Sequence, residues 1–171
     1  MVGGRLSRSR RVVSPGAARR VTHSASGSAL VGVPTGTSDA DWRELRAMAF
    51  AALDHAYAPY SRFRVGAAIR SSDGRIYAGC NVENASYPAS MCAERVAVAT
   101  AVADGARDFV ALVIASEAAV PAAPCGLCRQ VLGELGPRLE ISSCTSRGVE
   151  SRWSISSLLP SPFTSQSLDR S

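Results

Sequence analysis

The first strong pattern in the chain is an apolar stripe at helical spacing between residues 39 and 57. Ser38 stands at the start of this stretch and Asp41 follows three residues later, an arrangement typical of a capping box at a helix N-terminus. The residues that recur on one face are Trp42, Leu45, Met48, Ala49 and Leu53. The pattern therefore predicts an amphipathic helix that packs its apolar face on the core.

Three later segments have the character of strands. Residues 63–69 and 75–80 flank Ser72-Asp73-Gly74, a turn sequence typical of a β-hairpin. Residues 109–115 form a continuous apolar run, which is typical of a central strand covered on both faces. We therefore expect an antiparallel hairpin followed by a buried strand.

Two further helices are predicted around that buried strand. Residues 91–103 and 126–135 combine apolar and small residues, and they end at Gly105 and at Gly136-Pro137. Strand, helix, strand, helix is the order of a crossover unit, and right-handed crossovers place both helix N-termini at the same edge of a sheet. The sequence thus predicts an α/β fold, a three-layer α/β/α domain with a mixed sheet whose later strands are parallel.

Basic residues are distributed unevenly along the chain. Six of the nineteen Arg lie in residues 1–38, where there is no acid, and the rest of the chain holds thirteen Arg against fourteen Asp and Glu. The net charge of +5 therefore belongs to the N-terminal stretch. We interpret residues 1–37 as a disordered basic extension and residues 38–171 as one folded domain. A transit peptide or a nucleic-acid-binding arm are the alternatives for the extension, although such an arm would lack aromatic residues.

Candidate chemistry gathers at the starts of the two later helices. Cys92-Ala93-Glu94 is followed by Pro124-Cys125-Gly126-Leu127-Cys128, with 33 positions between Cys92 and Cys125. A C-x-E and a P-C-x-x-C at such a spacing are the signature of zinc-dependent deaminases. Three thiolates leave the fourth position of a tetrahedral zinc ion free for water, as a catalytic site requires. The sequence therefore predicts one Zn²⁺ per chain.

Two other interpretations of the cysteines stay open. Cys125 and Cys128 alone would fit a redox pair, and a structural zinc site would need a fourth ligand from elsewhere in the chain. The candidates for that ligand are Cys80, Cys144, His23 and His55. None of them lies in a tight pair, which favours the catalytic site.

The same stretches supply groups for a hydrolytic deamination. Zinc lowers the pKa of its bound water from about 15.7 towards 7, so that a zinc-bound hydroxide can attack C4 of cytosine. Glu94 lies two residues from a ligand and would carry protons to a ring nitrogen and to the leaving ammonia. Three thiolates leave a divalent ion with a negative formal charge. We expect Arg95 and Arg129 to offset it by hydrogen bonds to sulfur.

Four stretches together resemble the small homotetrameric cytidine deaminases. They are Ala58–Ala68, Gly79–Tyr87, Cys92–Arg95 and Pro124–Gln130, and the resemblance resumes at Leu158–Phe163. The resemblance implies a five-stranded sheet and the hydrolysis of cytidine and 2′-deoxycytidine to uridine and 2′-deoxyuridine in pyrimidine salvage. It also implies a cytoplasmic homotetramer whose active sites are shared between subunits. Nothing in it calls for a nucleic-acid or membrane partner, and the chain has no apolar run of about 18 residues.

The resemblance assigns roles to residues around the expected metal. Phe63 is similar to the aromatic residue that packs on the pyrimidine ring, and Ala93 to a backbone contact with the base. Asn81 and Glu83 are similar to the pair that holds the ribose. Their spacing alone would favour a solvated turn.

Tyr87 and Phe163 resemble residues that reach into the pocket of a neighbouring subunit, where Phe163 would stack over the base; the plainer alternative for Phe163 is a C-terminal core anchor. The chain departs from the family in residues 141–152, which are polar and have weak strand patterning. The last strand, and the tetramer packing behind Phe163, are therefore left open. The rival functions are a blasticidin-type cytosine nucleoside deaminase and a catalytically impaired, zinc-stabilised interaction module.

Overall fold

The structure is a computed structural model that describes residues 36–168. The expected basic extension, residues 1–37, lies outside the described residues except for its last two positions. The elements in chain order are α1 (Asp39–Leu53), β1 (Val65–Ser71), β2 (Ile76–Cys80), η1 (Tyr87–Ala89), α2 (Ala93–Ala103), β3 (Phe109–Ser116), α3 (Gly126–Leu135), β4 (Glu140–Thr145), β5 (Glu150–Ser154), α4 (Ile155–Leu158) and η2 (Ser165–Leu168).

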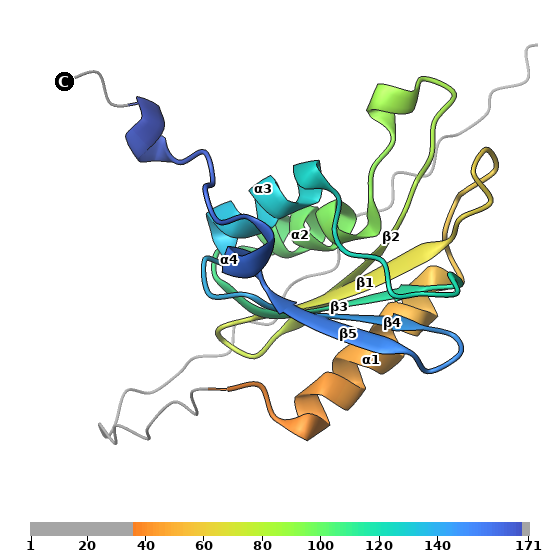
Figure 1. The fold of residues 1–171 in the computed structure, drawn as a ribbon, viewed down its shortest axis with the longest axis horizontal. Coiled ribbons are helices and arrows are strands. Elements are labelled where there is room, and N and C mark those ends of the chain that lie inside the picture. Colours follow the sequence, from red (N-terminus) through yellow and green to blue (C-terminus); the bar gives the residue numbers. More distant parts are fainter. Residues whose placement is uncertain (1–35, 169–171) are drawn as a thin grey trace, which may run out of the picture. The chain divides into compact units, whose positions relative to one another are not determined.

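The five strands form one mixed sheet in the order β2-β1-β3-β4-β5. β3 and β4 are parallel, and the other neighbouring pairs are antiparallel. Helix α1 covers one face of the sheet while α2 and α3 cover the other, as Figure 1 shows. The expected three-layer α/β/α fold with a mixed five-stranded sheet is confirmed.

Strand β3 separates two apolar clusters, one on each face of the sheet. Leu112 and Ile114 belong to the cluster beneath α2 and α3, and Ala111 and Val113 belong to the cluster beneath α1. All four side chains are buried. This is the central, doubly covered strand that the continuous apolar run predicted.

Helix α1 begins where the sequence placed it and ends earlier. Ser38 and Asp41 form the capping box, and the expected stripe is buried except for Met48, which is partly buried. The helix stops at Leu53, four residues before the predicted end. Tyr57 instead pairs with Val82 in an isolated parallel bridge, so a tertiary contact replaces the last helical turn.

Two glycines allow the helices to lie close to the hairpin. A Cβ atom at Gly66 would fall 2.0 Å from the carbonyl oxygen of Ala49 in α1. A Cβ atom at Gly79 would fall 2.4 Å from the backbone nitrogen of Ala97 in α2. Since ordinary carbon contacts begin near 3.4 Å, both positions exclude any larger side chain unless a helix moves.

The polar stretch that left the last strand open forms β4 and β5. The side chains of Ser142 and Cys144 are small and buried, and the Ser142 hydroxyl donates to Glu150 Oε1 at 2.7 Å. Glu150 also forms an ion pair with Arg46 of α1. Arg152 of β5 lies 4.7 Å from the ring centroid of Trp42. Polar and cation–π contacts therefore hold this edge, where the sequence had left the last strand open.

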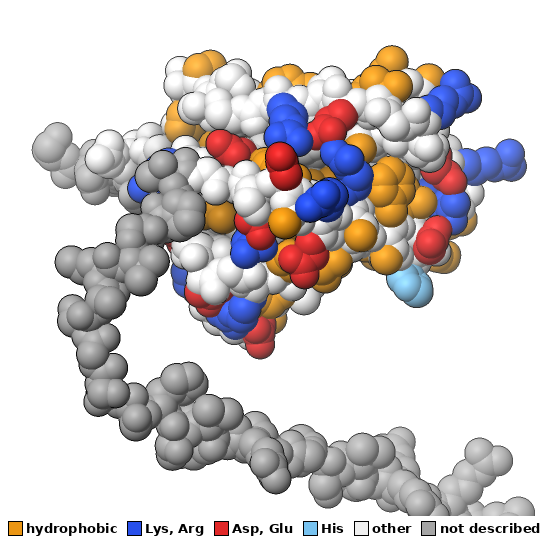
Figure 2. Space-filling model, turned by 90° about the horizontal axis from the view of Figure 1, so that it is seen from below, with side chains coloured by type: hydrophobic (Ala, Val, Ile, Leu, Met, Phe, Trp, Pro, Cys, Tyr) orange, Lys and Arg blue, Asp and Glu red, His pale blue; other side chains and the backbone are white. Residues whose placement is uncertain are grey.

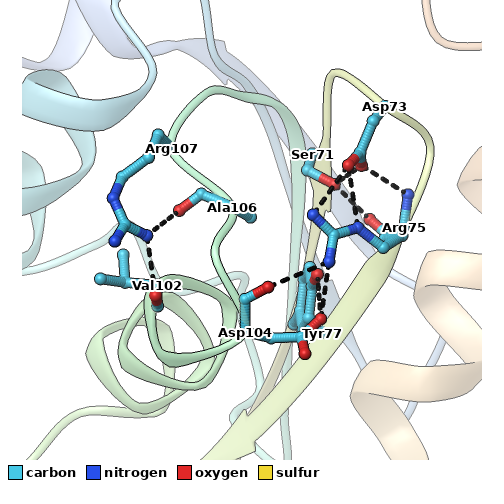
Figure 3. Close-up of polar contacts among 8 residues, drawn as sticks. All are labelled: Ser71, Asp73, Arg75, Tyr77, Val102, Asp104, Ala106 and Arg107. Carbon is cyan, nitrogen blue, oxygen red and sulfur yellow. Dashed lines mark hydrogen bonds and ion pairs between the residues drawn. The ribbon is translucent and has the colours of Figure 1, made fainter. Parts of the chain in front are cut away.

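A polar cluster ties the β1–β2 hairpin to the C-terminal end of α2 (Figure 3). Arg75 donates to Asp73 Oδ2 at 2.8 Å and to Asp104 Oδ2 at 2.7 Å. The Tyr77 hydroxyl donates to the same Asp104 oxygen at 2.8 Å. The hydrogen bond from Arg75, together with one from Ser71, holds the pKa of Asp73 well below its usual range. The carboxylates of the cluster thus fix the hairpin to the helix that follows it.

On the side of α1, arginine and acidic side chains alternate over the surface, with apolar side chains between them (Figure 2). This mixture reflects the near balance of charge in residues 39–171. Within residues 36–168, no helix has the length and apolar character needed to cross a membrane.

Candidate metal centre and active site

Each helix on the α2–α3 face begins at a cysteine. Cys92 is the N-cap residue of α2 and Cys125 is the N-cap residue of α3, while Cys128 lies in the first turn of α3. Neither cap residue makes a side-chain hydrogen bond to its own helix, so both sulfurs remain available to a ligand. The positive end of a helix dipole favours a thiolate at such a position.

The three sulfurs lie close enough to share one metal ion. All three atoms are within 4.8 Å of one another, and Cys92 Sγ is 3.8 Å from Cys125 Sγ. Zinc with tetrahedral bonds of about 2.3 Å to sulfur separates its ligand atoms by about 3.8 Å. The thiols therefore fit zinc. Among residues 36–168 the cluster has no fourth His, Cys, Asp or Glu, which fits a site with one position left for water.

Glu94 lies beside this cluster and is almost completely buried, with 5% of its surface exposed. Burial raises the pKa of its carboxyl group above the usual range. A buried carboxyl group with a raised pKa binds a proton more readily than an exposed one, as a general acid and base requires.

The thiols and the neighbouring arginine form one electrostatic unit. A hydrogen bond from Cys128, assisted by Cys125 and by the charge of Arg95, lowers the pKa of Cys92 to about 5. The pKa of Cys128 is raised in return. Arg95 Nη2 donates to the Ser90 carbonyl at 2.9 Å, which holds the guanidinium at the start of α2. Arg95 thus lies where the sequence expected a positive charge to act on sulfur.

Arg129 has partners other than the expected ones. Its Nε donates to the carbonyl of Pro124 at 2.8 Å, and its Nη1 donates to the carbonyl of Leu158 at 3.1 Å. Both acceptors are backbone oxygens. Arg129 therefore connects the loop before Cys125 to the end of α4.

Asn81 and Glu83 hold the segment that carries Phe63. Asn81 Oδ1 accepts from the Val65 N–H at 2.9 Å, and its Nδ2 donates to the Phe63 carbonyl at 2.8 Å. Glu83 Oε2 accepts from the N–H groups of Tyr60 and Ser61 at 2.8 and 3.1 Å. The Ser61 hydroxyl also donates to Glu83, and this bond contributes most to lowering the pKa of Glu83. The two backbone N–H bonds add to the effect, so that the carboxylate stays ionised.

The Asn81–Glu83 segment is pinned next to the first ligand. Val82 exchanges two backbone hydrogen bonds of 2.9 Å with Met91, the residue before Cys92. The structure therefore places the Asn81–Glu83 segment beside the residue that precedes Cys92, although eleven positions separate Asn81 from Cys92.

The remaining candidate residues differ in exposure. Ala93 is fully buried between the ligand and the acid. Phe63 is 42% exposed, Tyr87 73% and Phe163 58%. Tyr87 meets the ring of Tyr60 edge-on, with 6.2 Å between their centroids. These three aromatic side chains thus offer surface to a ligand or to another chain.

Residues 40–142 match the family model of the cytidine and deoxycytidylate deaminase zinc-binding region. The chain belongs to this deaminase family. The family's metal is zinc, and Cys92, Cys125 and Cys128 are the candidate zinc ligands of the deaminase.

Individual relatives extend over most of the deaminase fold. A cytidine deaminase of Sporosarcina psychrophila is 40% identical over 129 residues, which cover 75% of this chain and 95% of the relative. A crystal structure of cytidine deaminase from Burkholderia pseudomallei has a TM-score of 0.68 and 48% identity, covering 71% of this chain and 98% of that one. A cytidine deaminase structure from Mycobacterium tuberculosis has a TM-score of 0.64 and 41% identity, covering 74% and 99%.

One contact in the deaminase was not anticipated from the sequence. Gln130 lies inside a motif that was recognised, but its partner Phe163 is 33 positions away. The sequence shows only that Gln130 follows the ligand Cys128 by two residues. That position does not indicate which residue the Gln130 amide contacts.

Proposed function

We propose that this protein is a cytidine deaminase that hydrolyses cytidine and 2′-deoxycytidine to uridine and 2′-deoxyuridine in pyrimidine salvage. The observation that carries the proposal is the grouping of three thiols within 4.8 Å of one another beside the buried carboxyl group of Glu94. The cytidine deaminases of Sporosarcina psychrophila and Burkholderia pseudomallei, which share 40% and 48% identity with the chain, support it.

In this proposal Cys92, Cys125 and Cys128 hold the zinc ion. When bound, the ion supplies an activated water as nucleophile, because it lowers the pKa of that water towards 7. Glu94 would move two protons in turn, one from the attacking water to the ring nitrogen and one from the hydroxyl group added at C4 to the amino group that leaves as ammonia. Burial raises the pKa of Glu94 above the usual range, which favours a carboxyl group that holds a proton before delivering it.

The substrate roles follow from the segment beside the first ligand. Phe63 offers its exposed ring to the pyrimidine, and the buried backbone of Ala93 contacts the base. Glu83 stays ionised and can accept hydrogen bonds from ribose hydroxyls, and Asn81 retains a free N–H that can donate to them. Arg95 and Arg129 stabilise the ligand helices by charge and by hydrogen bonds to the backbone.

The proposal includes a homotetramer with active sites shared between subunits. Tyr87 and Phe163 support it, because large exposed aromatic side chains are typical of residues that a partner covers. We place the enzyme in the cytoplasm, since its five cysteines are free thiols and reducing conditions preserve thiol ligands. The folded deaminase domain is residues 38–171, and the basic extension has no role in turnover.

An ultraviolet assay of cytidine turnover tests the proposal, with zinc measured on the same samples. We expect the wild type to release ammonia and form uridine. Glu94→Gln should retain one zinc per chain and lose nearly all turnover, because the amide cannot shuttle protons. Glu134→Gln, an exposed change on α3, is the matched control and should match the wild type. A wild type that holds zinc yet deaminates no cytosine nucleoside contradicts the proposal.

A further inference from the structure

The C-terminal segment from residue 160 to residue 168 leaves the body of the domain after α4 (Figure 1). Its first four residues lie outside any helix or strand and are exposed. Pro160 and Pro162 have no N–H group to offer a neighbouring backbone. The place of this segment therefore depends on contacts that side chains of the body supply.

Gln130 supplies such a contact. Its Nε2 donates to the carbonyl of Phe163 at 2.7 Å, and its Oε1 accepts from the N–H of the same residue at 3.3 Å. Within the described part of the chain, these two hydrogen bonds are the ones that join residues 160–168 to the rest. An amide that engages both polar groups of one residue fixes the direction of its backbone as well as its position.

The helix that supplies Gln130 also carries metal ligands. Gln130 lies two residues after Cys128 in α3, and the adjacent Arg129 donates to the carbonyl of Leu158 at 3.1 Å. One turn of α3 therefore holds a zinc ligand, the end of α4 and the backbone of Phe163. The C-terminal segment is tied to the metal centre through this turn.

We propose that Gln130 is a positioning residue of the deaminase, which fixes the ring of Phe163 relative to the zinc-binding helix. The inference rests on the proposed function with its shared active sites, in which Phe163 of one subunit reaches the pocket of a neighbouring subunit and stacks over the base there. With 58% of its surface exposed, Phe163 has limited packing within the chain, so the two hydrogen bonds to its backbone are what set the point from which its ring extends. Holding a binding residue in place reduces the entropy lost when substrate binds.

Hydrogen exchange tests the tie without any need for activity. Gln130→Met keeps the length of the side chain and removes both hydrogen bonds. The amide of Phe163 should then exchange about fivefold faster or more, the change expected for loss of one hydrogen bond. Glu134→Gln, one turn further along α3, is the control and should leave exchange unchanged. Equal exchange in Gln130→Met and wild type overturns the inference.

Kinetics test whether the tie acts through Phe163. Gln130→Met should raise KM for cytidine about tenfold and leave kcat within about twofold, since the zinc ligands and Glu94 are untouched. Combined with Phe163→Ala, it should add nothing to the KM of Phe163→Ala alone. Effects that multiply, or a fall in kcat with loss of zinc, would place Gln130 in another role. A wild type without deaminase activity refutes the proposed function. In that case the hydrogen-exchange measurement alone tests whether Gln130 holds the backbone of Phe163.

Discussion

Substitution of Gly79 by Ala should disrupt stability and activity together, because this glycine lies directly beneath the helix that starts at Cys92. The added Cβ atom would lie 2.4 Å from the nitrogen of Ala97, and 2.9 Å from both the carbonyl oxygen of Ala93 and the carbonyl carbon of Val96. All three are backbone atoms, so a side-chain rotation cannot relieve the contact. Helix α2 must retreat by about 1 Å to restore an ordinary contact distance.

The expected magnitude follows from that displacement. Overpacking a rigid site lowers the free energy of unfolding by about 1–3 kcal/mol. We expect the upper end of that range here, because the added Cβ atom would clash with three backbone atoms. Cys92 and Glu94 move with the helix, and a misplacement of about 1 Å in an active site can lower the rate about a hundredfold. We therefore expect Gly79→Ala to lose about 3 kcal/mol of unfolding free energy and most of kcat/KM.

Urea unfolding and steady-state turnover of cytidine measure the two effects. Gly133→Ala is the matched control, because its Cβ atom would meet the nearest side chain at 3.7 Å and alanine is the better helix former. That variant should be at least as stable as the wild type. If Gly79→Ala keeps both the stability and the turnover of the wild type, then α2 does not lie against β2 as described, and the reasoning fails.

Three further outcomes are expected. Arg95→Gln should weaken zinc binding in a chelator competition, since the charge of Arg95 helps to lower the pKa of Cys92; unchanged affinity and rate would exclude that role. The lowered pKa of Asp73 stabilises the fold above its ordinary value of 3.8, and this contribution is lost as pH falls below it, so Asp73→Asn should show a smaller drop in Tm on acidification; an identical drop would assign no such part to Asp73. Zinc at about a hundredfold excess over its Kd should stabilise the metal-free protein by about 2.7 kcal/mol, and a Tm that does not respond to zinc would exclude a folded-state site.

Local signals were sufficient to predict the start of most elements. The capping box at Ser38, the run that became β3 and the cysteines that cap α2 and α3 each carry their own short-range signal. The three-layer order followed from the alternation of strands and helices. These features depend on residues that are near one another in the sequence.

The β4–β5 edge and the end of α1 could not be predicted, because distant residues decide them. Glu150 forms an ion pair with Arg46, 104 positions away, and this contact helps to keep polar residues buried in β4. The hydrophobic pattern of β4 alone predicts only a weak strand. Tyr57 leaves α1 to pair with Val82. Hydrophobic periodicity contains no information about such partners.

The metal ligands and Glu94 were predictable for a different reason, since metal chemistry demands particular residue types at particular spacings. The structure brings the predicted thiols together, whereas the assigned roles of Phe63, Asn81 and Glu83 stay predictions. The hydrogen bonds of Arg129 to the end of α4 and of Gln130 to the C-terminal segment could not be predicted, because they end on backbone atoms that any sequence would offer.

A cluster made only of sulfur selects its metal by softness. Thiolates favour Zn²⁺ and Cu⁺, whereas Mg²⁺, Ca²⁺ and Mn²⁺ prefer oxygen donors. Cys92, Cys125 and Cys128 would therefore discriminate against the most abundant cellular cations without any restriction on ionic size. Copper remains as the natural competitor, so the supply of that element in the surroundings decides how much of the protein is correctly loaded.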